Sequence, residues 1–139
     1  HYPLRRQRQM CIRDRVNTAK IANETPDLTM FNGHANQYVF EPLKARVGER
    51  VRIWVLAAGP SRGCSFHVVG TQFDTVFKEG AYTLKRGNPE GGGCQALDLA
   101  SAQGGFVEMV FEEPGRYTFV NHSFVEMERG AKGFIEVTT

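Results

Sequence analysis

Short apolar runs recur along the chain from residue 28 onward, and several of them alternate apolar with polar positions. Glycine, proline, asparagine and serine separate these runs at a spacing of roughly ten residues, which is typical of strands joined by turns. The pattern therefore predicts an all-β domain. Its expected strands lie in the segments ARVGERVRIWVL (45–56), FHVVG (66–70), FDTVFKEG (73–80), QALDLA (95–100), GGFVEMVF (104–111), GRYTFVNH (115–122) and GFIEV (133–137).

The turns between these segments carry residues suited to tight reversals. Gly48 and Glu49 predict a hairpin within ARVGERVRIWVL. The apolar residues that share one face of its second strand are then Val51, Ile53 and Val55. Residues 113–115, Glu-Pro-Gly, predict a turn because proline presets φ and glycine accepts positive φ.

Roughly seven or eight short strands in about 110 residues predict a two-sheet Greek-key β-sandwich. The aromatic residues expected to fill its two inner faces are Trp54, Phe66, Phe111, Tyr117 and Phe119. One segment, SFVEMERG (123–130), favours a helical turn. Residues 16–27 have no clear period and are interpreted as a linker. The predicted domain therefore covers residues 28–139, and residues 1–27 are interpreted as a non-native or disordered tail and linker.

Composition fits a water-soluble globular class, with 41% hydrophobic and 23% charged residues, and no apolar run approaches the ~20 residues of a membrane span. The formal charge of +2 is misleading. Removing the five arginines and one aspartate of residues 1–15 from the 17 basic and 15 acidic residues leaves 12 against 14. A mildly acidic domain argues against nucleic-acid binding. The tail contains QMCIRDR, which looks like translated sequencing adapter, and it is left out of the fold argument.

Two segments look like common catalytic or phosphate-binding motifs, but neither is followed by the helix that its motif needs. GPSRG (59–63) matches the G-x-S-x-G pattern around Ser61, but a nucleophile elbow needs a helix after the motif and a predicted strand follows here. GNPEGGG (87–93) opens no helix, so it lacks the N–H array of a phosphate-binding loop. Neither CxxC nor HExxH occurs.

Three histidines lie outside the tail: His34, His67 and His122. His34 lies in a polar turn, FNGHANQY, and we expect it to be exposed. Counting by two along the strands places His67 opposite Phe66, and His122 opposite Phe119. Both imidazoles are therefore expected to leave the face that carries the aromatic side chains. Taken locally, His67 is either a hydrogen-bonded core histidine or a histidine at a metal or proton-transfer site.

His122 and Met127 copy the spacing of the last two ligands of a blue-copper site. Such a site also needs a cysteine thiolate and a second imidazole. The nearest upstream cysteine, Cys94, lies 28 residues before His122. We therefore expect no type 1 copper in this domain, and we interpret Met127 as a packing residue.

A family resemblance covers roughly residues 28–139. The motifs SFHVVGTQFDTVF, GGFVEMVFEEPGRYTFVNHSF and RGAKGFIEV occur in the order and spacing of the C-terminal cupredoxin domain of copper-containing nitrite reductases. The chain also resembles the related multicopper oxidases. This resemblance implies a cupredoxin-like fold, a copper cofactor, and an enzyme that reduces nitrite, a small molecule, to nitric oxide.

The resemblance also implies roles for single residues. The histidine matching His122 is a ligand of the type 2 copper, and the one matching His67 stands beside that copper and delivers protons to bound nitrite. Imidazole suits both roles, as a copper ligand and as a proton carrier. Val69 matches a branched aliphatic residue that crowds the substrate. Gln95 falls near a polar position behind the ligands.

The first cupredoxin domain of the family, with its blue copper and the other type 2 ligands, is missing here. Since one ligand and one neighbouring histidine do not make a metal site, we interpret the chain as a fragment of a longer enzyme that is inactive alone. Its first residue is His1 rather than Met, so we expect the true N-terminus to be missing. In the family the type 2 copper is shared with the first domain of a neighbouring subunit, in a homotrimer. Two alternatives remain: a laccase-like multicopper oxidase domain, and a metal-free cupredoxin-fold module for assembly or binding.

The resemblance further implies a periplasmic or extracellular location, although no secretory h-region is visible. In an oxidising compartment Cys64 and Cys94 are candidates for a disulfide. The alternative is two separate small buried residues. Cys11 belongs to the tail.

Overall fold

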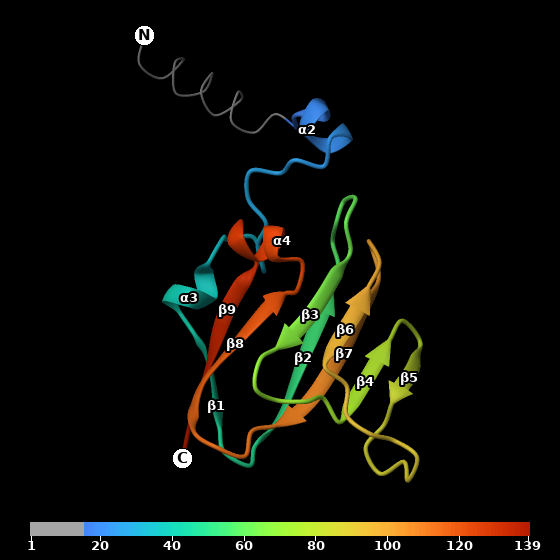
Figure 1. Cartoon of the computed structure of the whole chain (residues 1–139), viewed down its shortest axis with the longest axis vertical. Helices are drawn as coiled ribbons and strands as arrows, with labels where there is room; N and C mark the ends of the chain where they lie inside the picture. Colours follow the sequence, from blue (N-terminus) through green and yellow to red (C-terminus); the bar gives the residue numbers. More distant parts are fainter. Residues whose placement is uncertain (1–15) are drawn as a thin grey trace.

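Residues 16–139 are described by a computed structural model, in which two β-sheets face each other (Figure 1). The larger sheet has the order β1-β9-β8-β3-β6, formed by Leu43–Arg46, Lys132–Thr138, Gly115–Asn121, Cys64–Val68 and Ala96–Leu99. The smaller sheet has the order β2-β7-β4-β5, formed by Arg50–Leu56, Gly104–Val110, Thr75–Lys78 and Ala81–Leu84. The two-sheet sandwich predicted from the strand pattern is therefore confirmed.

Three short helices lie outside the sheets of the described part: α2 (Thr18–Ala22), α3 (Gln37–Phe40) and α4 (Phe124–Glu128). Helix α4 lies within the segment for which the sequence predicted a helical turn, at the end of β8 in Figure 1. Helix α2 lies in the segment interpreted as a linker, where Asn17 caps it by accepting a hydrogen bond from the backbone N–H of Lys20. None of the helices in residues 16–139 has the length and apolar character needed to cross a bilayer. The interpretation of residues 1–15 as a non-native tail lies outside the described residues.

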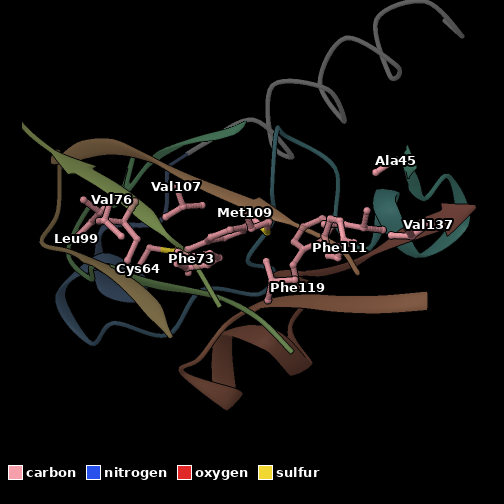
Figure 2. Packing of buried hydrophobic residues seen from close by; sticks show 14 of the residues in the cluster. Ala45, Cys64, Phe73, Val76, Leu99, Val107, Met109, Phe111, Phe119 and Val137 are labelled. Carbon is pink, nitrogen blue, oxygen red and sulfur yellow. The ribbon is translucent and has the colours of Figure 1, made fainter. Parts of the chain in front are cut away.

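The hydrophobic core fills the space between the sheets, with side chains from both inner faces (Figure 2). Strand β3 shows how alternation builds it, since Cys64, Phe66 and Val68 are buried while the residues between them are partly exposed. The largest fully buried side chains include Phe73, Phe111, Leu97, Leu99, Met109 and Ile135. Of the aromatic residues predicted for the core, Phe66, Phe111 and Phe119 are buried, and Tyr117 packs against the cluster.

The hairpin predicted at Gly48 and Glu49 is wrong. Strand β1 before the turn pairs in parallel with β9, whereas β2 after it pairs antiparallel with β7 in the other sheet. Gly48 has φ +77° and donates its N–H to the carbonyl of Phe111, so the turn carries the chain from one sheet to the other. Both strands then turn their apolar residues toward the same core from opposite sides. Local alternation alone does not distinguish this crossing from a hairpin.

Trp54 was predicted to fill the core but is 67% exposed. It alternates with the inward-facing Ile53 and Val55, so it lies on the outer face of β2, with its ring 4.8 Å from that of Phe106. Strand β5 (Ala81–Leu84) was not predicted from the sequence. Three of its four residues are exposed, so it lacks the apolar alternation that marks the other strands.

The contrast between core and outer aromatic residues can be measured. Replacing Phe73, which has no exposed surface, by alanine is expected to lower the free energy of unfolding by about 3–5 kcal/mol, because a cavity remains. Replacing Trp54 by alanine is expected to cost only about 1 kcal/mol, mainly the loss of its contact with Phe106. Urea unfolding of both variants measures the difference, and equal losses would contradict this account of the core.

Candidate metal centre

His67 and His122 come from neighbouring strands of the larger sheet. Strand β3 pairs antiparallel with β8, with Phe66 opposite Asn121 and His67 opposite Val120. The backbone N–H of His122, just beyond β8, donates to the carbonyl of Ser65 at 2.8 Å. Phe66 points into the core, so His67 points out of the sheet, and His122 follows on the same outer side. The prediction that both imidazoles point away from the face that carries the aromatic side chains is confirmed.

The two imidazole rings lie against each other on this outer face. Their centroids are 5.3 Å apart, with an angle of 65° between the ring planes. The ring of His122 also packs against that of Phe124, at 5.0 Å between centroids. His67 is half-buried and His122 is exposed. Two imidazoles from residues 55 positions apart are thus brought together where solvent or another protein surface can reach them.

The orientation of His67 is set by a hydrogen bond to the main chain. Its Nδ1 lies 2.5 Å from the carbonyl oxygen of Gln95. A carbonyl oxygen only accepts hydrogen bonds, so Nδ1 carries a proton and donates it to this oxygen. The other ring nitrogen, Nε2, takes no part in this hydrogen bond. Gln95, predicted as a polar residue behind the site, therefore contacts His67 through its backbone rather than through its exposed amide.

Asn121 was missed by the sequence analysis. Its side chain is only 6% exposed, and its Oδ1 accepts hydrogen bonds from the backbone N–H of Ser65 at 3.1 Å and of Ser123 at 3.4 Å. It thereby ties the strand that carries His67 to the residues on both sides of His122. The available signal was a polar amide next to a histidine at the end of an apolar strand, where a buried amide needs partners.

Exposed apolar side chains lie close in sequence to the two histidines. Val69 continues the outward-facing positions of β3 and is 50% exposed. Phe124 and Val125, at the start of α4, are also more than half exposed. Exposed apolar residues grouped around polar ones are typical of surfaces that another protein covers. His34 lies elsewhere, exposed in a turn where it forms an isolated bridge with Phe31.

The donors on this face suit a transition metal but are too few to hold one. Imidazole is a good copper ligand, and one exposed imidazole beside a second, oriented one fits part of a metal site. Stable sites take three or four protein ligands. Within residues 16–139 no group of three or more His, Cys, Asp or Glu side chains is placed to bind a metal ion. Within the described residues, the two imidazoles alone are therefore too few to hold a metal ion.

The candidate disulfide is contradicted, because Cys64 and Cys94 are both free thiols. Cys64 pairs with Leu99 at one end of the β3–β6 ladder, whereas Cys94 lies two residues before Ala96 at the other end. At about 3.3 Å per residue the cysteines are roughly 16 Å apart, far beyond the ~7 Å that a disulfide spans. Burial, and to a smaller extent Asp98, raises the pKa of the Cys64 thiol to about 11.

Comparison with known proteins finds copper enzymes. The chain is 35% identical over 120 residues to the copper-containing nitrite reductase of Neisseria gonorrhoeae and 31% identical over 116 residues to that of Neorhizobium galegae. These alignments cover 85% and 82% of the chain but only 29% of each relative, so the chain spans less than a third of their length. No family model matches.

Solved structures of copper enzymes are also similar to this chain. The copper-containing nitrite reductase (NirK) of Thermus scotoductus SA-01 matches with a TM-score of 0.74 and 30% identity, over 86% of this chain and 27% of that one. A multicopper oxidase matches with a TM-score of 0.68 and 26% identity, over 80% and 37%. These similarities confirm the Greek-key, cupredoxin-like sandwich and the resemblance inferred from the sequence.

The free cysteines can be tested by their reactivity. A thiol reacts as the thiolate, and at pH 8 a group with a pKa of about 11 is ionised only about once in a thousand. In a Cys11→Ser chain, Cys94, which is partly exposed, is therefore expected to react with iodoacetamide before Cys64 does. Mass spectrometry of the native protein measures both rates, with urea-unfolded protein as the control. Equal native rates, or a missing thiol pair in the unreduced protein, would contradict the assignment.

Proposed function

Because copper-containing nitrite reductases match most of this chain, we propose that residues 28–139 form the C-terminal cupredoxin domain of such an enzyme, which reduces nitrite to nitric oxide. The observation that supports this most directly is the pair of outward-facing imidazoles, His67 and His122, 5.3 Å apart on one face of the sheet. A histidine pair of this kind has no packing role in the core. It is suited to chemistry at a surface.

His122 is proposed as the ligand of a type 2 copper. It is the more exposed of the two imidazoles, at the end of β8, and its backbone is fixed by the hydrogen bond to Ser65. Copper bound there would supply the electron that nitrite reduction requires. No type 1 copper is proposed for this domain, since no cysteine stands within ligand spacing of His122.

His67 is proposed as the catalytic proton carrier. Reducing nitrite to nitric oxide and water takes one electron and two protons, so a proton donor beside the substrate is a stoichiometric requirement. The hydrogen bond from Nδ1 to the carbonyl of Gln95 holds the ring in one orientation and leaves Nε2 to hold or pass a proton. Val69, on the same outer face, is proposed as an apolar wall beside the substrate.

The site is proposed to be complete only in a longer, assembled protein. Two imidazoles are too few to bind a metal stably, and the curated relatives are more than three times as long as the matched segment. The exposed Val69, Phe124 and Val125 fit a surface covered by the first domain of a neighbouring subunit. We propose a homotrimer in the periplasm or outside the cell, and an isolated chain without activity. Two further histidines and a blue-copper ligand set encoded upstream would support this, and their absence would favour a metal-free module.

The incomplete ligand set leads to a first prediction. Adding Cu(II) to the purified chain is expected to produce no intense thiolate-to-copper absorption and only weak binding. The physical reason is that no cysteine lies within ligand spacing of His122 in the sequence, and that in the described structure none is placed to bind a metal ion together with the histidine pair. Visible absorption spectroscopy during a copper titration measures this, and an intense blue colour would contradict the proposed division of the copper sites.

A second prediction separates the two histidines in the full-length enzyme. His122→Ala is expected to empty or cripple the type 2 site while the blue copper remains, because it removes a ligand. His67→Ala is expected to keep both coppers and to lower turnover by about 10²–10⁴-fold, the usual contribution of a general acid or base. Copper content, melting temperature and turnover are measured on each variant, with His34→Ala as the control.

The alternative for His67 is a purely structural role. In that case His67→Ala would lower stability by roughly 1–3 kcal/mol through lost hydrogen bonding, and activity per folded molecule would stay unchanged. Full turnover in a destabilised His67→Ala enzyme would therefore end the proton-carrier proposal. Loss of the type 2 copper in His67→Ala, with His122→Ala unaffected, would reverse the two assignments.

A further inference from the structure

Helix α4 carries a buried carboxylate that the proposed chemistry does not use. Glu126 is 5% exposed and lies four residues after His122. Its Oε2 accepts a hydrogen bond from the hydroxyl of Thr29, and its Oε1 accepts one from Nη1 of Arg62 at 3.3 Å. A buried carboxylate is costly unless it is paired and hydrogen-bonded, so these contacts hold α4 in one position.

Arg62 joins three parts of the chain that are distant in sequence. It lies two residues before β3, the strand that carries His67. Its Nη1 bonds to Glu126 on α4, and its Nε donates to Oε2 of Glu24, in the segment before the sandwich, at 2.8 Å. The hydrogen bond to Glu24, followed by the attraction of both carboxylates, raises the pKa of Arg62 above its usual value. The guanidinium therefore stays charged, and it links the start of β3, which carries His67, to α4, which begins two residues after His122.

The C-terminal end of α4 is held by hydrogen bonds from residues 29–36. The N–H of Thr29 donates to the carbonyl of Arg129 at 3.2 Å, and the N–H of Asn36 donates to that of Gly130 at 3.0 Å. Gly130 has φ +122°, and a Cβ there would lie 2.7 Å from the Cβ of Ala35. The chain thus leaves α4 through a position that only glycine suits, packed against residues 29–36.

A second set of hydrogen bonds lies closer in sequence to the histidines His67 and His122. Ser65 accepts the N–H of His122 through its carbonyl and donates its own N–H to Oδ1 of the buried Asn121. Ser65 lies two residues from His67. Together with the Arg62–Glu126 pair, these bonds tie the N-terminal part of β3 and the residue two before it to the β8–α4 segment at two places, both on the N-terminal side of His67.

From this arrangement we infer that Arg62, Glu126 and Asn121 are positioning residues that set the ring-to-ring geometry of His67 and His122. The inference deepens the proposed function, and it rests on that function for its catalytic meaning. The geometric part of the inference rests on the hydrogen bonds and the ion pair described above, and it does not require bound copper. It assigns to the ion pair between the buried Glu126 and the half-exposed Arg62, which does not touch the reacting atoms, the task of keeping the two imidazole centroids 5.3 Å apart.

A second pair of an arginine and a carboxylate, remote from the histidines and more exposed at its carboxylate, separates positioning from general stability. Arg50 binds Asp74 through two hydrogen bonds of 2.9 and 2.7 Å, and it is partly buried on the smaller sheet, which carries neither histidine. Asp74→Asn weakens this pair as Glu126→Gln weakens the other. Both substitutions are nearly isosteric, and both are expected to lower the melting temperature.

The experiment follows the contact between the rings in the full 139-residue chain, labelled at histidine, by nuclear Overhauser spectroscopy. The wild-type chain and Asp74→Asn are expected to show a cross-peak between the ring protons of His67 and His122. Glu126→Gln and Arg62→Gln are expected to lose it while the rest of the spectrum stays dispersed. Asn121→Ala is expected to lose it as well, because Ser65 and Ser123 lose their common acceptor.

Opposite outcomes overturn the inference. A cross-peak of wild-type intensity in Arg62→Gln and Glu126→Gln, with only the melting temperature lowered, would make the ion pair purely structural. Arg62 is about half exposed, so Arg62→Gln is expected to fold even if the buried Glu126→Gln does not. Loss of the cross-peak in Asp74→Asn would show that any destabilisation disturbs the rings. Since no copper or nitrite is present, these results do not depend on whether the domain belongs to a nitrite reductase.

Discussion

The position of β3 between β8 and β6 is the constraint on which the site depends. With both edges of the strand hydrogen-bonded, its register cannot slip without turning every side chain to the other face. Phe66 and Val68 are anchored in the core, so His67 is directed outward. The same ladders bring His122 beside it from β8 and the carbonyl of Gln95 behind it from the start of β6. Core packing thus determines the geometry of a surface site.

In the proposed enzyme, a surface site of this kind would be conditional on assembly. The larger sheet presents two imidazoles and a border of exposed apolar side chains, but not the donors that a metal needs. In the proposed enzyme, copper binding and subunit contact would then be coupled, because the same face would serve both. By the inference above, the polar contacts of Asn121, Arg62 and Glu126 would fix the two imidazoles before assembly, so that less ordering would remain when the proposed partner surface binds.

The sequence by itself led to wrong predictions for the pairing of two strands, the burial of one side chain and the pairing of two cysteines. The alternation around Gly48 indicates two strands and a turn, but it does not say whether those strands pair with each other or with β9 and β7. Trp54 was placed in the core because of its size, whereas its place in the alternation puts it outside. The cysteines were considered together because they remained as a pair, although β3 and β6 place them at opposite ends of a ladder. For the Gly48 turn and the cysteines the decisive contacts join residues far apart in the chain, whereas the alternation along β2 was sufficient to place Trp54 outside.

By itself the sequence determined the strand segments other than β5, the inward direction of Phe66 and Phe119, and the outward direction of His67 and His122. These properties follow from a period of two and from the tendency of apolar groups to leave water, and both are local. The motifs also carried the family resemblance. Only the tertiary structure decided that the two rings touch, that Gln95 contacts His67 through its carbonyl, and that Asn121 and Glu126 are buried where they are. Those facts depend on hydrogen bonds between residues 28, 56 and 64 positions apart, and no short stretch of sequence specifies which distant strand supplies the partner.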